Sequence, residues 1–333
     1  MYEEASHFLI DHGDMQAATD LGGYYYGKKI YDLALKYYQL AADHGVPYAW
    51  TGLGYIWYYG RLGTRDYEKA YHCYAKVLEL LTGERIEDDG FWQPDKKVKL
   101  KGAGEYDDYI NAVYKLADMY RSGHYVEKNW VHYADLIRRL YAMMTDPDNT
   151  MVPDYHLPEI ELRLAEILLD GPREMVSWID GLTAPEAGSD AAKGKMLESS
   201  PDAAKDNALE LLFDAKDRMA GRLMDNAFFG NFSIMKSIVL KIYSLTPFDP
   251  EECDLYDLYY VLRKPCRVTF MCGDERHEIT AEQDGQETSV CLDGKWFHSV
   301  DDMMMKGRID GDKIPDICYD CYDFSIESAD SHV

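Results

Sequence analysis

Apolar and small residues recur with helical spacing through much of the first half of the chain. Within the stretch from Asp43 to Lys76, four residues fall at positions i, i+4, i+5 and i+8 and so form one stripe on a helix; they are Ala49, Leu53, Gly54 and Trp57. Two of the four are small, which allows another helix to approach closely. Gly60 suits the left-handed end of this helix, and Asp66 suits the N-cap of a second helix. The stretch therefore predicts a helix, a glycine turn and another helix.

The same pattern recurs on both sides of this stretch. A copy displaced by 32 residues supplies Ala17, Leu21, Gly22 and Tyr25. A copy displaced by 63 residues in the other direction supplies Ala112, Leu116, Ala117, Tyr120 and Gly123. A fourth, weaker copy contains Leu164, Ala165, Leu168 and Gly171. Paired helices repeated at this period predict a stacked helical solenoid.

The repeated pattern, A-x3-L-G-x2-Y-x2-G followed by D-Y-x-K-A-x3-Y, resembles the Sel-one-like repeat family, which is related to tetratricopeptide repeats. The best-matching residues are those of the second copy: Gly54, Gly60, Asp66, Tyr67, Lys69, Ala70 and Tyr74. The resemblance covers residues 10–140 well and 159–180 poorly. It implies an α/α superhelical solenoid that binds a protein or peptide on its concave face and has no catalytic activity of its own.

By the same resemblance, the concave face is lined by defined positions of each first helix. Here these positions are Tyr26, Tyr48, Thr51, Tyr55, Tyr58, Asn111, Tyr114 and Arg121. Tyrosine and arginine are enriched at binding hot spots, and the chain contains 28 tyrosines. The alternative is that these bulky side chains simply fill the space between repeats.

The remainder of the chain predicts a mainly α protein with a small α+β domain at its C-terminal end. Glycine and proline predict a non-helical insertion at 82–108 within a solenoid spanning 1–180. A Gly-, Ala- and Ser-rich stretch at 181–202 predicts a linker or mobile loop. Two capping helices follow at 203–247, and an α+β domain at 248–333. Its strands are expected at 267–271, 278–281, 287–292, 295–297 and near 324–326, with an Asp-Gly hairpin turn after the third strand.

The charge of the chain restricts its partners. With 60 acidic and 35 basic residues the net charge is −25, which would repel nucleic-acid phosphates and favours a basic partner. No apolar run has membrane-spanning length, and the first residues do not form a secretory signal. The seven cysteines are odd in number and do not pair within the repeats, so we expect reduced thiols and a cytoplasmic location.

Sequence motifs for catalysis are missing. There is no phosphate loop, dinucleotide glycine motif or serine elbow, and His277-Glu278 lacks the second histidine of a zinc-protease helix. Cys318 and Cys321 have metal-like spacing but no second such pair, so they are only weak metal candidates. We therefore predict a non-catalytic binding scaffold that needs no cofactor and has neither a nucleic-acid nor a membrane partner. Two alternatives stay open: an acidic inhibitor or immunity-type protein that sequesters a basic toxin or enzyme, and a zinc-binding C-terminal module.

Overall fold

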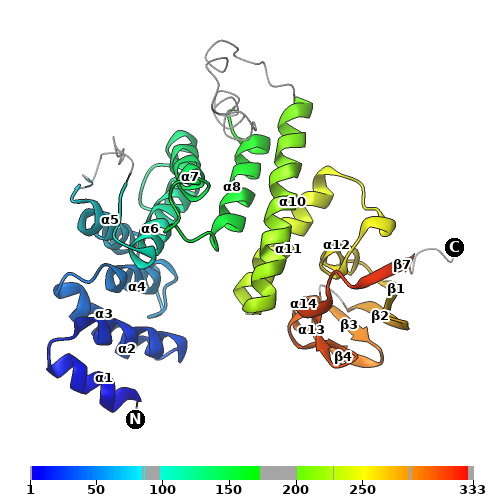
Figure 1. Cartoon of the computed structure of the whole chain (residues 1–333), viewed down its shortest axis with the longest axis horizontal. Helices are drawn as coiled ribbons and strands as arrows, with labels where there is room; N and C mark the ends of the chain where they lie inside the picture. The colour runs from blue at the N-terminus through cyan, green and yellow to red at the C-terminus, as the bar shows by residue number, and fades with distance from the viewer. Residues whose placement is uncertain are drawn as a thin grey trace. The chain divides into compact units, whose positions relative to one another are not determined.

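The computed structural model is mainly helical, with one small antiparallel sheet near the C-terminal end (Figure 1). It describes residues 2–84, 86, 98–172, 201–227, 229–284 and 287–328. The chain divides into two compact units, Met1–His156 and Leu157–Val333. Each unit is described on its own below.

The first unit is a solenoid of helical hairpins. Each helix packs against the next one along the chain from α1 to α7, and the first helices of successive hairpins also contact one another, α2 with α4 and α4 with α6. The helices are α1 (Tyr2–Asp11), α2 (Met15–Gly27), α3 (Tyr31–Asp43), α4 (Pro47–Tyr58), α5 (Tyr67–Thr82), α6 (Ala103–Ser122) and α7 (Trp130–Met144). This arrangement confirms the predicted helical repeats in this part of the chain.

The repeat glycines are required by close packing within each hairpin. A Cβ atom built on Gly54 would lie 2.5 Å from Cε1 of Tyr74, whose ring is fully buried. Gly22 is equally close to the ring of Tyr38, at 2.6 Å from Cδ1. The sequence prediction that small residues permit a close helix approach is therefore confirmed, and the approaching groups are tyrosine rings of the second helices.

The predicted helix boundaries of the second repeat are also confirmed. Gly60 has a φ of 63°, in the left-handed region, directly after α4. The Asp66 carboxylate accepts a hydrogen bond from the backbone N–H of Lys69 at 3.0 Å, as an N-cap does.

The insertion is shorter than its glycines suggest. α6 begins at Ala103, so residues 103–108 are helical although we expected no helix before 109. Gly102 is the extended N-cap residue and Gly104 lies in the first turn, where no other group lies within 4 Å of its position. Glycine is tolerated there because tertiary packing of α6 outweighs its low helix propensity.

The second unit begins with a helical layer. α8 (Leu157–Asp170) packs on α10 (Pro201–Asp225), and α10 packs on α11 (Phe229–Leu245). Glu161 on α8 is buried and accepts a hydrogen bond from Nε of Arg218 at 3.2 Å. The boundary between the two compact units falls after His156, within the range 1–180 that the sequence analysis gives to the repeats. The predicted linker at 181–202 lies almost entirely outside the described residues.

The C-terminal module is an antiparallel five-stranded sheet with the order β4-β3-β2-β1-β7. Its strands are β1 (Cys266–Cys272), β2 (Glu275–Asp284), β3 (Glu287–Leu292), β4 (Lys295–Phe297) and β7 (Cys321–Ser328). They correspond to the five expected strands. A separate hairpin of β5 (Arg308–Ile309) and β6 (Asp312–Lys313) was not expected from the sequence. The short helices are η2 (Pro250–Glu252), η3 (Leu255–Asp257), α12 (Leu258–Val261), α13 (Val300–Lys306) and α14 (Ile314–Ile317).

A buried ion triad joins α10 to this module. The Lys216 ammonium lies 2.6 Å from a carboxylate oxygen of Asp257 and 2.9 Å from one of Asp254. Burial alone would lower the pKa of Lys216, but the two carboxylates outweigh burial and raise it. The lysine is therefore held in its charged form.

Among the described helices, none combines the length and the apolar character needed to cross a membrane.

Candidate tyrosine surface of the first unit

The first helices of three successive hairpins bring their tyrosines together on one surface. We call this the tyrosine surface and define it by Tyr26 of α2, by Tyr48, Tyr55, Tyr58 and Tyr59 of α4 and its C-cap, by Tyr114 of α6, and by the cations Arg61 and Lys115. Most of these tyrosines are partly exposed, and Tyr48 and Tyr59 are the most exposed among them. They are therefore not simply core residues.

Arg61 connects the first repeat to the second. Its Nε donates a hydrogen bond to the Tyr26 hydroxyl at 3.0 Å. The guanidinium carbon also lies 5.1 Å from the ring centre of Tyr59 and 5.7 Å from that of Tyr31. A guanidinium held over several rings gains cation–π attraction from each.

Lys115 connects the second repeat to the third in the same way. Its Nζ donates a hydrogen bond to the Tyr59 hydroxyl at 2.8 Å. The same ammonium lies 5.2 Å from the ring centre of Tyr58 and 5.6 Å from that of Tyr114. The two cations thus bind neighbouring tyrosines into one contiguous surface.

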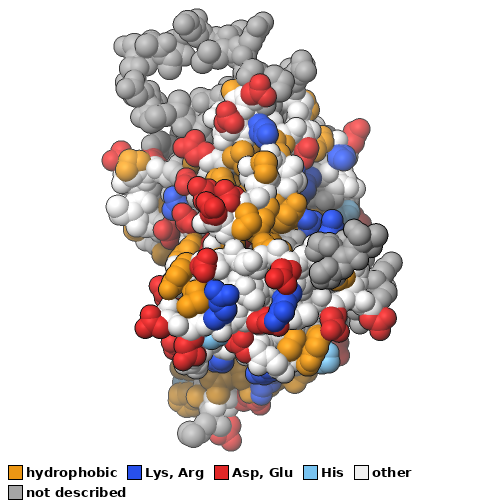
Figure 2. Space-filling model, turned by 90° about the vertical axis from the view of Figure 1, so that its right-hand side faces the viewer, with side chains coloured by type: hydrophobic (Ala, Val, Ile, Leu, Met, Phe, Trp, Pro, Cys, Tyr) orange, Lys and Arg blue, Asp and Glu red, His pale blue; other side chains and the backbone are white. Residues whose placement is uncertain are grey.

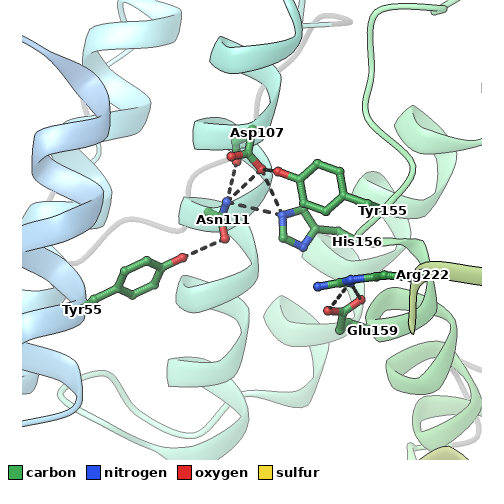
Figure 3. Close-up of polar contacts among 7 residues, drawn as sticks. All are labelled: Tyr55, Asp107, Asn111, Tyr155, His156, Glu159 and Arg222. Atoms are coloured by element: carbon green, nitrogen blue, oxygen red, sulfur yellow. Dashed lines mark hydrogen bonds and ion pairs between the residues drawn. The ribbon is translucent and has the colours of Figure 1, made fainter. Parts of the chain in front are cut away.

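Polar contacts extend from this surface to the end of the unit (Figure 3). The Tyr55 hydroxyl donates to Oδ1 of Asn111 at 2.8 Å, and Nδ2 of Asn111 donates to Oδ1 of Asp107 at 3.1 Å. Asp107 also accepts from the Tyr155 hydroxyl and lies 3.0 Å from Nε2 of His156. Burial raises the pKa of Asp107, but the bonds from His156 and Tyr155 outweigh burial and hold it below its ordinary value.

Asp108, the next residue along α6, has its pKa shifted in the opposite direction. It is 8% exposed, and its Oδ1 has no hydrogen-bond partner among the described residues. Burial, with repulsion from Asp107 and Glu105, raises its pKa to about 7. Asp108 also raises the pKa of Tyr48, after the larger effect of burial. An under-satisfied carboxyl therefore acts electrostatically on Tyr48, one of the two most exposed tyrosines of the surface.

The predicted site residues are only partly brought together. Tyr26, Tyr55, Tyr58, Asn111 and Tyr114 share the contacts described above, and Tyr48 lies at the acidic end. Thr51 is completely buried and cannot contact a partner, so its inclusion is corrected. α4 is buried on more than one side, because Thr51 lies roughly opposite Ala49 and Leu53 around the helix and all three are buried. Arg121 lies over the ring of Tyr133 at 5.9 Å, on the side of α7.

Four residues of the site were missed from the sequence: Tyr59, Arg61, Lys115 and Asp108. Arg61 and Tyr59 belong to the turn that is four residues longer in the second repeat than in the first. That extra length was a signal, because a longer turn reaches across to the neighbouring hairpin. Asp108 gave no signal, since its burial depends on neighbours distant in the chain.

A separate pocket of about 720 Å³ lies between α6, α7 and the segment 98–100. Its lining combines Tyr106, Tyr109 and Met143 with the guanidinium groups of Arg138 and Arg139. Both arginines are already paired with the Asp135 carboxylate, at 3.0 Å and 2.6 Å. None of the predicted site residues lines this pocket.

The weak metal candidates Cys318 and Cys321 are both buried. Burial raises the pKa of Cys318 to about 12 and raises that of Cys321 as well. Within the described residues, neither belongs to a group of three potential ligands. The geometry therefore gives no support to a zinc site at this pair.

Comparisons with known proteins add little to these observations. No protein-family model matches the chain, and no curated protein matches it. One similar solved structure is that of a protective antigen, c5321, of uropathogenic Escherichia coli strains, described as displaying an SLR fold. It is 17% identical, with 78% of this chain and 70% of that chain covered, at a TM-score of 0.22. A TM-score this low does not bear on the fold, which rests on the helices themselves.

Proposed function

We propose that the first unit is a non-catalytic scaffold that binds a protein or peptide on the tyrosine surface, in the manner of Sel-like and tetratricopeptide repeats. The observation that carries the proposal is the continuous contact from Tyr26 through Arg61, Tyr59 and Lys115 to Tyr114, across three repeats. Direct packing of the first helices on one another supports their lining the inner side of the solenoid.

The surface has the composition of a binding hot spot. Tyrosine rings offer a large apolar area at low conformational-entropy cost, and their hydroxyls remain available for hydrogen bonds. Arg61 and Lys115 hold the rings in place, so less side-chain freedom is lost when a partner binds. Such preorganised aromatic surfaces favour extended peptides or loops that carry apolar and polar groups in alternation.

The partner is a basic one in this proposal. The net charge of −25 attracts positive partners at long range, although the face shown in Figure 2 carries basic and hydrophobic side chains among its acidic ones. Nearer the surface, the under-satisfied Asp108 carboxyl acts electrostatically on Tyr48 and adds to this negative potential. A lysine or arginine of a partner bound at Tyr48 would be attracted to this carboxyl when it is ionised.

A basic toxin or enzyme would meet the same requirements, so an inhibitor or immunity-type role is one form of this proposal. Both forms rest on the same surface. They differ in the partner. In the inhibitor form the partner is a toxin or enzyme that loses activity on binding, and in the scaffold form it is a protein that is only held in place.

The test uses the full chain and two series of short peptides of equal length. One series carries lysine or arginine beside tyrosine and leucine, and the other carries glutamate in place of the basic residues. We expect only the basic series to bind. Raising salt from 50 to 500 mM should weaken binding without abolishing it, because the aromatic contacts are not screened.

Point variants distinguish binding at the tyrosine surface from non-specific attraction to the negative charge of the protein. Tyr48→Ala and Asp108→Asn should each weaken binding of the basic peptides about tenfold or more, as the loss of a hot-spot contact does. Tyr322→Ala, an exposed tyrosine of the other unit, is the matched control and should leave binding unchanged. Equal loss in the control, or full binding by Tyr48→Ala, would show that the tyrosine surface is not the site.

A further inference from the structure

His277 in the C-terminal module is a buried histidine with one satisfied and one unsatisfied ring nitrogen. The residue is 6% exposed. Nδ1 lies 2.8 Å from Oδ2 of Asp293, whereas Nε2 has no hydrogen-bond partner in the part of the chain that the structure describes. An unpartnered buried ring nitrogen costs free energy unless something else bonds to it.

The unsatisfied nitrogen faces two carboxylates. Nε2 lies 3.6 Å from Oδ2 of Asp310, which is too long for a hydrogen bond. Glu275 contributes the other carboxylate, and one ligand atom of each of the three residues lies within 4.8 Å of the others. Both carboxylates are exposed, so their side chains are free to adjust.

Three local structures hold these groups in place. Glu275 and His277 are two residues apart on β2, so their side chains lie on the same face of the sheet. Asp310 lies in the turn between β5 and β6 with a φ of 54°, and Gly311 follows with a φ of 95°. This Asp-Gly pair forms a tight hairpin turn that presents the Asp310 carboxylate to the sheet.

Asp293 has a supporting role that recurs at metal sites. It lies in the Asp-Gly turn between β3 and β4, and its Oδ1 accepts from the backbone N–H of Glu278 at 2.9 Å. Its other oxygen accepts the Nδ1 hydrogen of His277, which leaves Nε2 as a lone-pair donor. Metal-binding histidines commonly donate their second N–H to a carboxylate in this way, which fixes the tautomer and the ring orientation.

We propose that His277, Glu275 and Asp310 bind a divalent first-row transition metal ion, with Zn²⁺ favoured over Mn²⁺ and both over Mg²⁺. One imidazole nitrogen and two carboxylate oxygens suit such ions, while an imidazole disfavours Mg²⁺ and Ca²⁺. Ligand atoms about 2.1 Å from a tetrahedral zinc lie about 3.4 Å apart, so the exposed carboxylates need to close by only about an ångström. Water would complete the coordination shell.

Such an ion would do two things in this module. It would reduce the mutual repulsion of the three carboxylates gathered around the His277 ring. It would also connect the β5–β6 hairpin to the main sheet, since Asp310 and the β2 ligands come from different sheets. Binding that occurs only in the folded state raises stability in proportion to the logarithm of metal concentration.

The test is titration of the full chain, kept reduced because its seven cysteines are free, with Zn²⁺, Mn²⁺ and Mg²⁺ by calorimetry. We expect one equivalent of zinc to bind and the unfolding temperature to rise. Substitution with Co²⁺ should give the absorption of nitrogen and oxygen ligation without intense thiolate-to-cobalt bands. The Cys318→Ser/Cys321→Ser variant should bind zinc as the wild type does.

Matched double variants identify the ligands. Glu275→Gln/Asp310→Asn should weaken zinc binding at least 100-fold, and Asp293→Asn about 10- to 100-fold through the histidine. Glu282→Gln/Asp312→Asn removes two exposed charges from the same strand and hairpin and should bind normally. All four residues of these double variants are exposed, so folding should be preserved.

Two outcomes would overturn the proposal. One is zinc binding that is unchanged in Glu275→Gln/Asp310→Asn or lost only in the cysteine variant. The other is no binding of Zn²⁺ or Co²⁺ at 100 µM, with the nitrogen NMR signals of His277 showing both ring nitrogens protonated. In that case the histidine is simply an imidazolium held between Asp293 and Asp310.

Discussion

The Tyr55 hydroxyl donates a 2.8 Å hydrogen bond to the side-chain oxygen of Asn111, which joins the first helices of two successive repeats. The bond is part-buried, and burial raises the pKa of Tyr55 well above its ordinary value. Tyr55 therefore stabilises the solenoid as well as contributing to the tyrosine surface.

Tyr55→Phe should lower the free energy of unfolding by about 1–2 kcal/mol, because it removes this bond and leaves the Asn111 oxygen with one partner fewer. Urea unfolding followed by circular dichroism measures the change. Tyr67→Phe is the control, since its hydroxyl only accepts an exposed bond from Arg65, and it should change stability by less than about 0.5 kcal/mol. A larger loss of stability in Tyr67→Phe would mean that the Tyr55 hydroxyl does not stabilise the protein more than an exposed tyrosine hydroxyl does.

Gly54→Ala should destabilise the protein by about 1–3 kcal/mol, although alanine is the better helix former. The reason is the distance of 2.5 Å between the new Cβ and the buried ring of Tyr74, which has no room to move. Gly104→Ala in α6 places its Cβ where no other group lies within 4 Å, and it should be neutral or stabilising by up to about 1 kcal/mol. Thermal unfolding of both variants measures the contrast, and equal effects would contradict the packing argument.

Asp108→Asn should stabilise the protein more at high pH than at low pH. The folded-state pKa of Asp108 is raised to about 7 from an ordinary 3.8, so the wild type loses stability as pH rises from about 4 to about 7. The variant lacks this loss. Its stability relative to the wild type should therefore increase by about 2–3 kcal/mol between pH 5 and pH 8, at 1.36 kcal/mol per pKa unit.

Denaturant unfolding at several pH values measures this difference, and subtracting wild type from variant removes the contributions of other titrating groups. Glu127→Gln, at an exposed position of the same unit, is the control and should show a much smaller pH-dependent difference. A difference that is independent of pH would mean that Asp108 titrates normally.

Lys216→Met should cost about 3–5 kcal/mol of stability, because it leaves the carboxylates of Asp254 and Asp257 buried without their cation. Lys205→Met, at an exposed position of the same helix, should cost less than about 0.5 kcal/mol. Combining Lys216→Met with Asp254→Asn and Asp257→Asn should recover part of the loss, since the unpaired charges are then removed. Equilibrium unfolding in urea decides between these outcomes.

The sequence alone was sufficient for the repeats of the first unit and for the five strands of the larger sheet. Both depend on local periodicity: the spacing of Ala49, Leu53 and the small residue Gly54 recurs in the first and third copies, and the Asp293-Gly294 pair marks a tight turn between two strands. Such signals survive in a single sequence because each is read over a few neighbouring residues. The same locality explains the failure at residues 103–108, where glycines suggested a loop and packing produced a helix.

The sites depended on the tertiary structure. The sequence named Tyr26, Tyr55 and Tyr58, but only the folded chain shows that Arg61 and Lys115 join them and that Thr51 is buried. In the C-terminal module, Glu275 and His277 are separated from Asp310 by more than 30 residues and by three further strands. Contacts between residues so distant in the chain arise when two turns face one strand, and no pattern within a short window of sequence records them.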